Sequence, residues 1–275
     1  MICFFLARFS HLGIKYTAKP KTLMERTMSK INGKISIIMP AYNEEAHIYE
    51  NILETRNVFE EEHEDFEIII VDDGSSDRTY QNSQKAADEF PDVMVVKQPH
   101  NMGKGWALRK GFEKATGNYV VFLDSDLDLH PRQIHLLFDI MDKNQADVVI
   151  GSKRHPDSRL NYPKDRKIIS SGYFFLVKMM FGLPLRDTQT GLKLFKYVVL
   201  ENVFPKICVK RYAFDLEVLV VAHHKGYKIA ESPIVLEHHW KFGRIGLKAI
   251  WDTWKETLAV YYRLKILKYY DRTNE

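Results

Sequence analysis

Apolar and polar positions alternate with two different periods along most of the chain. From residue 35 onward, short runs of apolar, β-favouring residues are each followed by a stretch in which apolar residues have helical spacing. The pattern predicts strands over 35–40, 67–72, 93–97, 118–124 and 146–151, and helices over 44–60, 77–89, 106–115 and 131–143. Strands that alternate with helices of this length form right-handed βαβ units, so we expect a Rossmann-like α/β fold with a mostly parallel central sheet flanked by helices.

The two ends of the chain differ from this pattern. Residues 1–33 show no usable periodicity, and we expect a poorly ordered extension there, before a domain that spans 34–240. Residues 241–275 form a predicted helical tail. In the tail, apolar residues at near-helical spacing are interleaved with basic ones: Ile245, Ala249, Trp254, Leu258 and Tyr261 with Lys248, Lys255, Arg263, Lys265 and Lys268. A basic amphipathic helix of this composition either lies at a lipid interface or packs across the domain.

The fourth predicted strand ends in a run of acids. Asp124, Asp126 and Asp128 are spaced two residues apart after the apolar stretch Tyr119-Val-Val-Phe-Leu. Carboxylates this close repel one another unless a cation or hydrogen bonds offset their charge. Oxygen ligands with no His or Cys nearby favour Mg²⁺ or Mn²⁺, which also bind substrate phosphates. The alternative is a solvated acidic loop in which Ser125 or Asp128 caps the next helix.

Two other strands end in polar motifs that should reach the same edge of the sheet. Pro40-Ala-Tyr-Asn-Glu44 follows the first strand, and Asp72-Asp-Gly-Ser-Ser-Asp77 follows the second. In an open α/β sheet, ligands bind outside the carboxyl ends of the strands. We expect Asn43 and Ser76 to cap helices, and Asp73 to face a ribose or a base from its place before the glycine turn.

A third motif, Asn101-Met-Gly-Lys-Gly105, leads into the helix predicted at 106–115. A glycine-bearing turn that enters a helix suits an approaching phosphate. The alternative is a turn that binds nothing.

Composition narrows the class of protein. With 275 residues, 45% of them hydrophobic and 28% charged, the chain is typical of a soluble globular protein. A formal charge of +4 is too small to indicate a nucleic-acid partner, and no apolar stretch approaches the ~20 residues of a membrane-spanning helix. Cys3 and Cys208 provide no disulfide framework, which favours a reducing compartment. The adjacent pairs His223-His224 and His238-His239 lack the spacing of a helical zinc site.

Several motifs occur together in a recognisable order. The first four are Pro40-Ala-Tyr-Asn-Glu44, Val71-Asp-Asp-Gly-Ser-Ser-Asp-Arg-Thr79, Asn101-Met-Gly-Lys-Gly105 and Asp124-Ser-Asp126. In order and spacing this set resembles inverting family 2 glycosyltransferases with the GT-A fold. Three later motifs are Gly151-Ser-Lys-Arg154, Asp165-Arg-Lys-Ile-Ile-Ser-Ser-Gly172 and Asp187-Thr-Gln-Thr-Gly-Leu-Lys-Leu-Phe195. They resemble the polyprenyl-phosphate branch, which includes dolichyl-phosphate mannosyl- and glucosyltransferases.

The last of these motifs, together with Arg211-Tyr-Ala-Phe-Asp-Leu-Glu217, is closer to the dolichyl-phosphate glucosyltransferases. The resemblance covers residues 35 to about 264. The family's downstream Arg-x-x-Gly-x-Ser-Lys element is not clearly present, and Lys241-Phe-Gly-Arg244 is the segment that would replace it.

The resemblance implies roles for individual residues. A nucleotide-sugar donor, UDP-glucose or GDP-mannose, would be bound by Pro40, Tyr42, Glu44, Asp73 and Lys104. Asp124 and Asp126 would face the sugar and a Mg²⁺ or Mn²⁺ ion, with Asp128 as third ligand where mannosyl relatives often carry Gln. The acceptor phosphate would be bound by Arg154, Arg166, Ser170 and Arg244. The implied catalytic set is Asp124, Asp126, Arg154 and Arg166.

The implied reaction is the transfer of a hexose, glucose or mannose, with inversion, to a polyprenyl phosphate. A divalent ion held by carboxylates stabilises the departing diphosphate as a Lewis acid. A lipid monophosphate, with a second pKa near ~6, needs no general base, and the guanidinium fork of arginine suits its positioning.

A lipid acceptor also implies a location and partners. We expect a peripheral protein at the cytoplasmic face of a membrane, bound to the membrane surface or to a membrane-protein partner, and no nucleic acid. One alternative is the same fold with a saccharide acceptor and a carboxylate base. Another is a non-catalytic protein that binds nucleotide sugars at a membrane.

Three further carboxylates have both a functional and a structural interpretation. Asp187 begins a turn into a strand predicted at 191–196, and Asp215 and Glu217 lie near the start of a helix predicted to run to about residue 225. In such places a carboxylate either serves a site or orders the local backbone.

Overall fold

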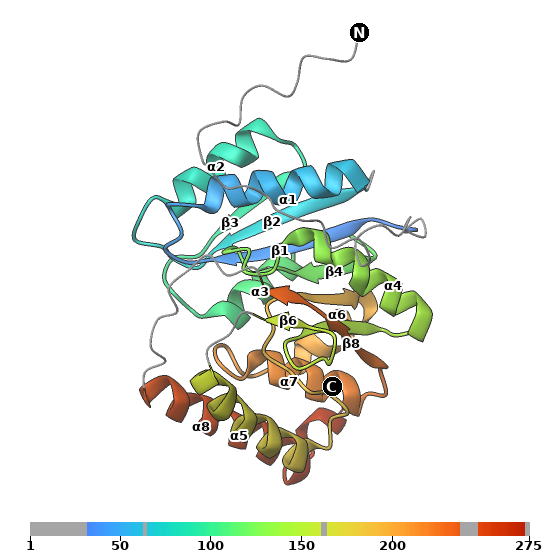
Figure 1. Ribbon diagram of the computed structural model, residues 1–275. Helices are drawn as coiled ribbons and strands as arrows, with labels where there is room; N and C mark the ends of the chain where they lie inside the picture. Colours follow the sequence, from blue (N-terminus) through green and yellow to red (C-terminus); the bar gives the residue numbers. More distant parts are fainter. Residues whose placement is uncertain (1–31, 63–64, 161–163, 237–246, 273–275) are drawn as a thin grey trace. The chain divides into compact units, whose positions relative to one another are not determined.

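The computed structural model describes residues 32–62, 65–160, 164–236 and 247–272 of the chain. The main sheet has the strand order β3-β2-β1-β4-β7-β5-β8 (Figure 1). Its strands are β1 Ile35–Ala41, β2 Phe66–Asp72, β3 Val93–Lys97, β4 Tyr119–Phe122, β5 Val148–Ser152, β7 Lys193–Lys196 and β8 Ile229–Pro233. Neighbouring strands are parallel, except that β7 runs antiparallel to both β4 and β5. The predicted α/β fold with a mostly parallel sheet is confirmed.

Helices cover both faces of this sheet because side chains of the central strands alternate between the faces. In β1, Ile37 and Met39 pack with α1, α2 and α4, whereas Ile38 packs with α3 and α7 on the opposite face. The helices are α1 Ile48–Glu62, α2 Thr79–Glu89, α3 Lys104–Phe112, α4 Ile134–Asn144, α5 Lys164–Phe181, α6 Tyr197–Val203, α7 Phe214–His224 and α8 Leu247–Lys265. The sheet is therefore buried on both sides, as a parallel sheet requires.

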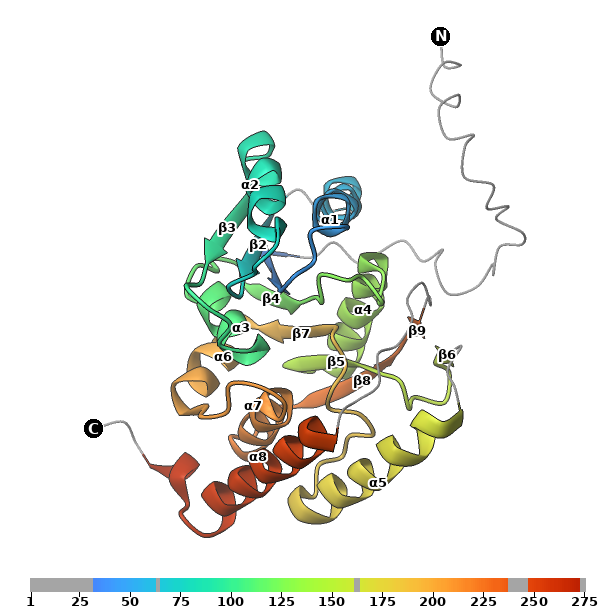
Figure 2. The same ribbon diagram turned by 90° about the vertical axis from the view of Figure 1, so that its left-hand side faces the viewer.

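Helices α5 and α8 lie side by side beyond α7, as Figure 2 shows. The hydroxyl oxygens of Tyr173 in α5 and Thr257 in α8 are 3.0 Å apart, and the rings of Phe181 and Tyr261 meet edge to face. A separate short parallel pair joins β6 Arg159–Leu160 to β9 Val235–Leu236. None of the helices in the described residues is both long and apolar enough to cross a membrane.

The helix predicted at 44–60 begins four residues later, at Ile48. The backbone N–H groups of His47 and Ile48 donate to the carbonyl oxygen of Glu44, which forms a turn ahead of the helix. The N–H of Glu44 donates to the hydroxyl of Thr79 at 2.7 Å, so this turn is fixed to the segment that follows β2. Long-range hydrogen bonds therefore set a boundary that helical periodicity alone does not reveal.

The predicted N-cap roles of Asn43 and Ser76 are wrong. Asn43 adopts a left-handed backbone conformation with φ of 57°, and its side-chain oxygen accepts the N–H of Ser76 at 2.9 Å. The N-cap of α2 is Arg78, two residues after Ser76. The two polar residues join the loops that follow β1 and β2 instead of ending helices.

The tail helix packs through one face and leaves part of the predicted apolar set exposed. Thr257, Val260 and Leu264 are buried, whereas Trp254 and Leu258 are 38% and 51% exposed. Arg263, one of the basic residues of the predicted tail helix, forms an ion pair with the fully buried carboxylate of Glu217 on α7 at 2.8 Å. The predicted extension at 1–33 lies almost wholly outside the described residues, and the predicted domain limits at 34, 240 and 241 stay predictions.

Glu67 on β2 connects the start of β1 to the loop before β4. Its carboxylate accepts hydrogen bonds from Lys34 at 2.9 Å, from the Ser36 hydroxyl at 2.6 Å and from the Thr116 backbone at 2.7 Å. Burial alone would raise the pKa of Glu67, but these donors outweigh burial and hold that pKa below its ordinary value.

We predict that Glu67→Gln lowers the free energy of unfolding by about 1–3 kcal/mol at pH 7, because the charged acceptor is lost. The folded-state pKa is the lower one, so the carboxylate stabilises the fold above about pH 4.3 and loses that effect as pH falls through the folded pKa. Urea unfolding at pH 7 and at pH 3.5 measures both effects. Glu60→Gln, on the exposed partner of Arg56, is the control and should change stability little. A penalty for Glu67→Gln that is unchanged at pH 3.5 contradicts the prediction.

Candidate active site

The carboxyl ends of β1, β2 and β4 meet around a pocket of about 270 Å³. The predicted site residues that line it are Pro40, Tyr42, Glu44, Asp73, Lys104, Asp124 and Asp126. They come from four loops that are widely separated in the sequence, and the parallel sheet brings those loops to one edge. The predicted convergence at the ends of the strands is thus present in the structure.

Lys104 and Asp124 form the central ion pair of this pocket. β4 ends at Phe122, which leaves Asp124 in the loop two residues beyond it, and Lys104 is the first residue of α3. The ammonium group donates to the Asp124 carboxylate, and the two side chains remain 36% and 39% exposed. Burial would lower the pKa of Lys104, but Asp124 and then Asp215 outweigh it and raise that pKa. In the same way Lys104 holds the pKa of Asp124 below its usual range against the effect of burial.

The other carboxylates of the pocket repel one another. Burial, then the charges of Asp124 and Asp128, raise the pKa of Asp126 to about 6. Burial also raises the pKa of Glu44, with the nearby charge of Asp126 as the next cause. This excess of negative charge is the electrostatic setting in which a divalent cation binds.

Asp126 has one contact that shapes the acidic loop. Its Oδ1 accepts the backbone N–H of Asp128 at 3.1 Å, and Leu127 between them has a φ of 50°. Across the described ranges, no three His, Cys, Asp or Glu side chains gather closely enough to hold a metal ion alone. A cation bound by Asp124 and Asp126 therefore needs further oxygen ligands from substrate phosphates or water, which is usual for Mg²⁺. The role of Asp128 as third ligand stays a prediction.

Asp73 positions the glycine turn that precedes α3. Its carboxylate is 3% exposed and accepts the backbone N–H groups of Met102 at 2.9 Å and Gly103 at 2.8 Å, and the side-chain amide of Gln98 at 2.9 Å. Burial raises the pKa of Asp73, and the two backbone donors oppose that rise. Asp73 thereby fixes the position of Lys104. A contact between Asp73 and the nucleotide-sugar donor stays a prediction.

Gly191 is a site residue that sequence reasoning did not single out. A methyl group at this position would lie 2.0 Å from Oδ2 of Asp124, so the carboxylate packs directly on the glycine backbone. Gly191 lies inside the Asp187–Phe195 motif, and that motif was the available signal. Lys193, 1% exposed and paired with Asp215 at 2.8 Å, is a second such residue, and its charge also lowers the pKa of Asp124.

The three carboxylates with open interpretations all have partners within the protein. Asp187 accepts the backbone N–H of Lys153 at 3.0 Å and orders the turn before β7. Asp215 pairs with Lys193, and the fully buried Glu217 accepts from Arg263 and from two backbone N–H groups. These contacts support the structural interpretation of each.

The predicted acceptor residues are only partly described. Arg154 follows β5, and its guanidinium lies 5.0 Å from the centre of the Phe174 ring on α5. Arg166 and Ser170 belong to α5, but their side chains lie outside the described part, and Arg244 lies outside the described residues altogether. Their joint action on one phosphate stays a prediction.

Sequence comparison finds a family with these motifs. A sequence model of Glycosyl transferase family 2 matches residues 36–204. One dolichyl-phosphate beta-glucosyltransferase of Trichomonas vaginalis is 35% identical over 73% of this chain and 64% of its own length. A second from the same organism is 32% identical over 86% of this chain and 76% of its own length. The Saccharomyces cerevisiae dolichyl-phosphate beta-glucosyltransferase is 30% identical over 73% of this chain and 66% of its own length. The chain thus spans just under two thirds of the first relative.

Solved structures share the fold. Glucosyl-3-phosphoglycerate synthase of Mycobacterium tuberculosis with bound UDP has a TM-score of 0.65 and 19% identity, over 89% of this chain and 82% of that one. The Pyrobaculum calidifontis mannosyltransferase PcManGT, crystallised with GDP-Man and Mn²⁺, has a TM-score of 0.59 and 20% identity, over 90% of this chain and 68% of that one. The synthase has also been crystallised with Mn²⁺ and UDP-glucose. These likenesses confirm the predicted GT-A architecture.

We predict that Gly191→Ala weakens Mn²⁺ binding in the presence of UDP by about 10- to 100-fold, since the new methyl group displaces the Asp124 carboxylate from its position. Titration calorimetry measures the affinity, and thermal unfolding should show an intact fold. Gly172→Ala is the matched control, because a methyl group there meets no atom within 4 Å. Equal affinities for the two variants would contradict this role of Gly191.

Proposed function

The chain belongs to glycosyl transferase family 2, and on that premise we propose that it transfers glucose from UDP-glucose, with inversion, to dolichyl phosphate or a related polyprenyl phosphate. The observation that carries the proposal is the pocket in which Asp124, Asp126 and Lys104 meet at the ends of three parallel strands. The names of the relatives support the choice of glucose and of a lipid phosphate. GDP-mannose is the second candidate donor.

The pocket around Lys104, Asp124 and Asp126, called the donor pocket from here on, has the charges that this transfer needs. Asp124 and Asp126 would hold a Mg²⁺ or Mn²⁺ ion, which when bound supplies a Lewis acid for the departing diphosphate. Lys104 adds a positive charge beside them, at the start of α3, where backbone N–H groups also favour an anion. Tyr42, 46% exposed at the mouth, offers a ring on which the base can stack. These residues orient the donor so that its anomeric carbon faces the acceptor.

The acceptor in this proposal needs positioning more than proton removal. A phosphate monoester is mostly dianionic at neutral pH and is itself a nucleophile. Arg154, together with Arg166, Ser170 and Arg244, would bind its oxygens through bidentate hydrogen bonds. Lys153 next to Arg154 lies near enough to the donor pocket for its charge to lower the pKa of Asp124. The segment that follows β5 thus reaches from the donor carboxylates to the proposed acceptor site.

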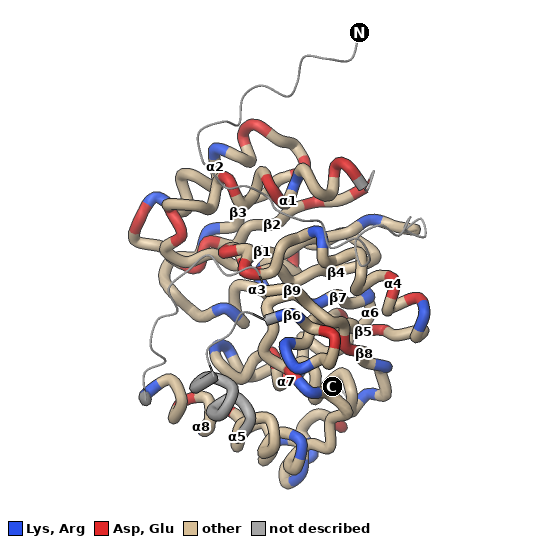
Figure 3. The backbone as a smooth tube through the Cα atoms, viewed as in Figure 1, with Lys and Arg blue, Asp and Glu red and all other residues tan. Residues whose placement is uncertain are grey.

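The paired helices α5 and α8 provide a surface that fits a lipid bilayer. Their large exposed apolar side chains are Phe175 and Met179 on α5 and Trp251, Trp254, Leu258 and Tyr262 on α8. Lys and Arg segments lie near the C-terminal ends of both helices, whereas α1 and α2 carry mostly acidic residues (Figure 3). Aromatic and apolar side chains flanked by lysines favour the interface of a membrane with anionic lipids.

This surface and the proposed acceptor site share helix α5. Phe174, whose ring faces the guanidinium of Arg154, is followed in α5 by Phe175, which is 67% exposed. A polyprenyl chain could thus stay in the bilayer while its phosphate reaches Arg154. We place the protein at the cytoplasmic face, where a chain with two cysteines and no disulfide framework stays reduced. A membrane-protein partner would bind the same surface.

The test of the reaction uses labelled UDP-glucose and GDP-mannose with dolichyl phosphate, and it measures organic-extractable label. We expect glucosyl lipid to form with Mg²⁺ or Mn²⁺ and to disappear with chelator. Arg154→Ala should abolish lipid product and leave UDP affinity within about twofold, because it removes only an acceptor contact. The control is Arg132→Ala, which removes an arginine paired with Glu61 and should leave the amount of lipid product unchanged. Label transferred to a saccharide, or UDP binding without turnover, would overturn the proposal.

We predict that Phe175→Glu combined with Met179→Glu lowers partition onto vesicles of phosphatidylcholine and phosphatidylserine by at least about tenfold. Burying each apolar side chain contributes about 1.5–3 kcal/mol, and the new charges also oppose insertion. Co-sedimentation measures the partition. Met94→Glu, which changes an exposed side chain on the edge strand β3, should leave it unchanged. Equal binding by both variants would show that α5 does not contact the lipid.

A further inference from the structure

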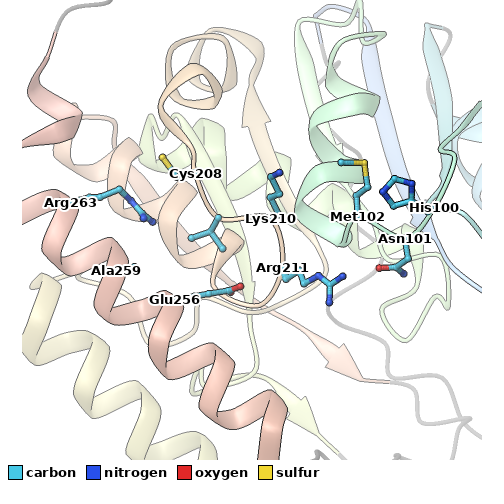
Figure 4. A pocket seen from close by; sticks show the side chains of 10 residues that line it. His100, Asn101, Met102, Cys208, Lys210, Arg211, Glu256, Ala259 and Arg263 are labelled. Atoms are coloured by element: carbon cyan, nitrogen blue, oxygen red, sulfur yellow. The ribbon is translucent and has the colours of Figure 1, made fainter.

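The structure has a second cavity of about 470 Å³, and Figure 4 shows the side chains that line it. Its walls are the loop 100–102, the loop 208–211 and one side of α8. Asn101 lines both this cavity and the donor pocket, so the two spaces are neighbours. None of the residues assigned above to the donor, the metal or the acceptor lines this second cavity.

The cavity carries an excess of positive charge. Lys210, Arg211 and Arg263 line it, against the single carboxylate of Glu256. One oxygen of Glu256 already accepts the backbone N–H of Ala213 at 2.8 Å. Arg263 uses Nε and Nη2 on Glu217, which leaves its other amino group without a described hydrogen bond.

Lys210 and Arg211 are exposed, and in the described part of the chain neither forms an ion pair with a carboxylate. The ammonium group of Lys210 instead lies 4.9 Å from the centre of the Trp106 ring. In Figure 4 the guanidinium of Arg211 extends toward Asn101 across the opening. Arg263 is paired with Glu217, and the charge of Arg211 opposes the rise in the pKa of Asp73 without forming an ion pair. Exposed cations that form no ion pair, such as Lys210 and Arg211, are the usual surroundings of a bound phosphate when they line a concave space.

We propose that this cavity is a second anion site that takes a phosphate group, carried either by a separate small molecule or by the nucleotide in the adjoining pocket. The first source would make it an effector site, and the second would make it an extension of the donor site. The volume is sufficient for a pyrophosphate or a nucleoside phosphate. The proposal rests on the arrangement of Lys210, Arg211 and Arg263 around the cavity. It does not depend on which sugar is transferred or on which acceptor receives it.

The loop that carries these cations also supports the donor pocket. The carbonyl oxygen of Lys210 accepts the backbone N–H of Gly105 at 3.0 Å. A methyl group at Gly103 would lie 2.6 Å from Cγ of Arg211, so the loop packs directly on the glycine turn. That turn is the one that Asp73 holds and that positions Lys104. An anion bound by the loop would therefore change nucleotide affinity, and the coupling would be reciprocal.

Cys208 provides the test, because it is an exposed thiol in the wall of the cavity. Cys3→Ser in the full chain leaves Cys208 as the only thiol. Its rate of reaction with N-ethylmaleimide is followed by mass spectrometry with and without pyrophosphate in chelator, at constant ionic strength. At a pyrophosphate concentration about tenfold above its Kd, we expect labelling to slow by about tenfold. The protection should disappear in the double variant Lys210→Ala with Arg211→Ala. The control is the double variant Lys114→Ala with Lys143→Ala, which should keep the protection because both lysines are exposed and lie outside the cavity lining.

The second arm uses UDP with Mn²⁺. Protection by pyrophosphate in chelator identifies a separate phosphate compound as the occupant, since the metal-dependent donor site is then disabled. Protection that requires UDP and Mn²⁺ together identifies the nucleotide. Labelling rates that neither condition changes, or protection that survives in the Lys210 and Arg211 double variant, would overturn the proposal. Failure of glucosyl transfer would not affect either result, which keeps the two proposals distinguishable.

Discussion

The balance of charge around Asp124 is the constraint on which the rest of the site depends. Parallel strands deliver several carboxylates to one edge of the sheet, and there burial and then mutual repulsion raise the pKa values of Asp126 and Glu44. Lys104 offsets this repulsion from the opposite wall, and Gly191 leaves the space in which the Asp124 carboxylate lies. One ammonium group does not neutralise all of the carboxylates, so the pocket keeps the excess of negative charge that favours a divalent cation.

The position of Lys104 depends on contacts outside the donor pocket. Asp73 accepts two backbone N–H groups from the turn before α3, and the loop that contains Lys210 accepts another from Gly105. The turn is therefore held from the β2 side and from the α7 side. Because the same loop forms a wall of the cationic cavity, a ligand there and a nucleotide in the donor pocket would act on one shared element, and no separate route between the two sites is required.

Much of the site could be predicted because its residues follow strands. A buried strand is visible as a short apolar run, and whatever follows it must lie at the sheet edge, so the motifs containing Tyr42, Asp73 and Asp124 were identifiable. Asn43 and Ser76 were misassigned because an N-cap is inferred from local sequence, and their real partners are each other across the two loops. The choice between a lipid interface and packing across the domain stayed open for the tail, because the burial of Val260 and Leu264 depends on their packing with the rest of the fold, which helical spacing does not specify.

The sequence by itself determined the α/β fold, the family and the residues at the ends of the strands, because periodicity and motif spacing are local properties of the chain. Only the tertiary structure decided that Asp73 holds the glycine turn, that Glu217 and Arg263 form a buried pair, and that Gly191 lies against Asp124. The physical reason is that each of these contacts joins segments distant in sequence, and its energy depends on a direction and a distance that exist only once the sheet and helices have packed.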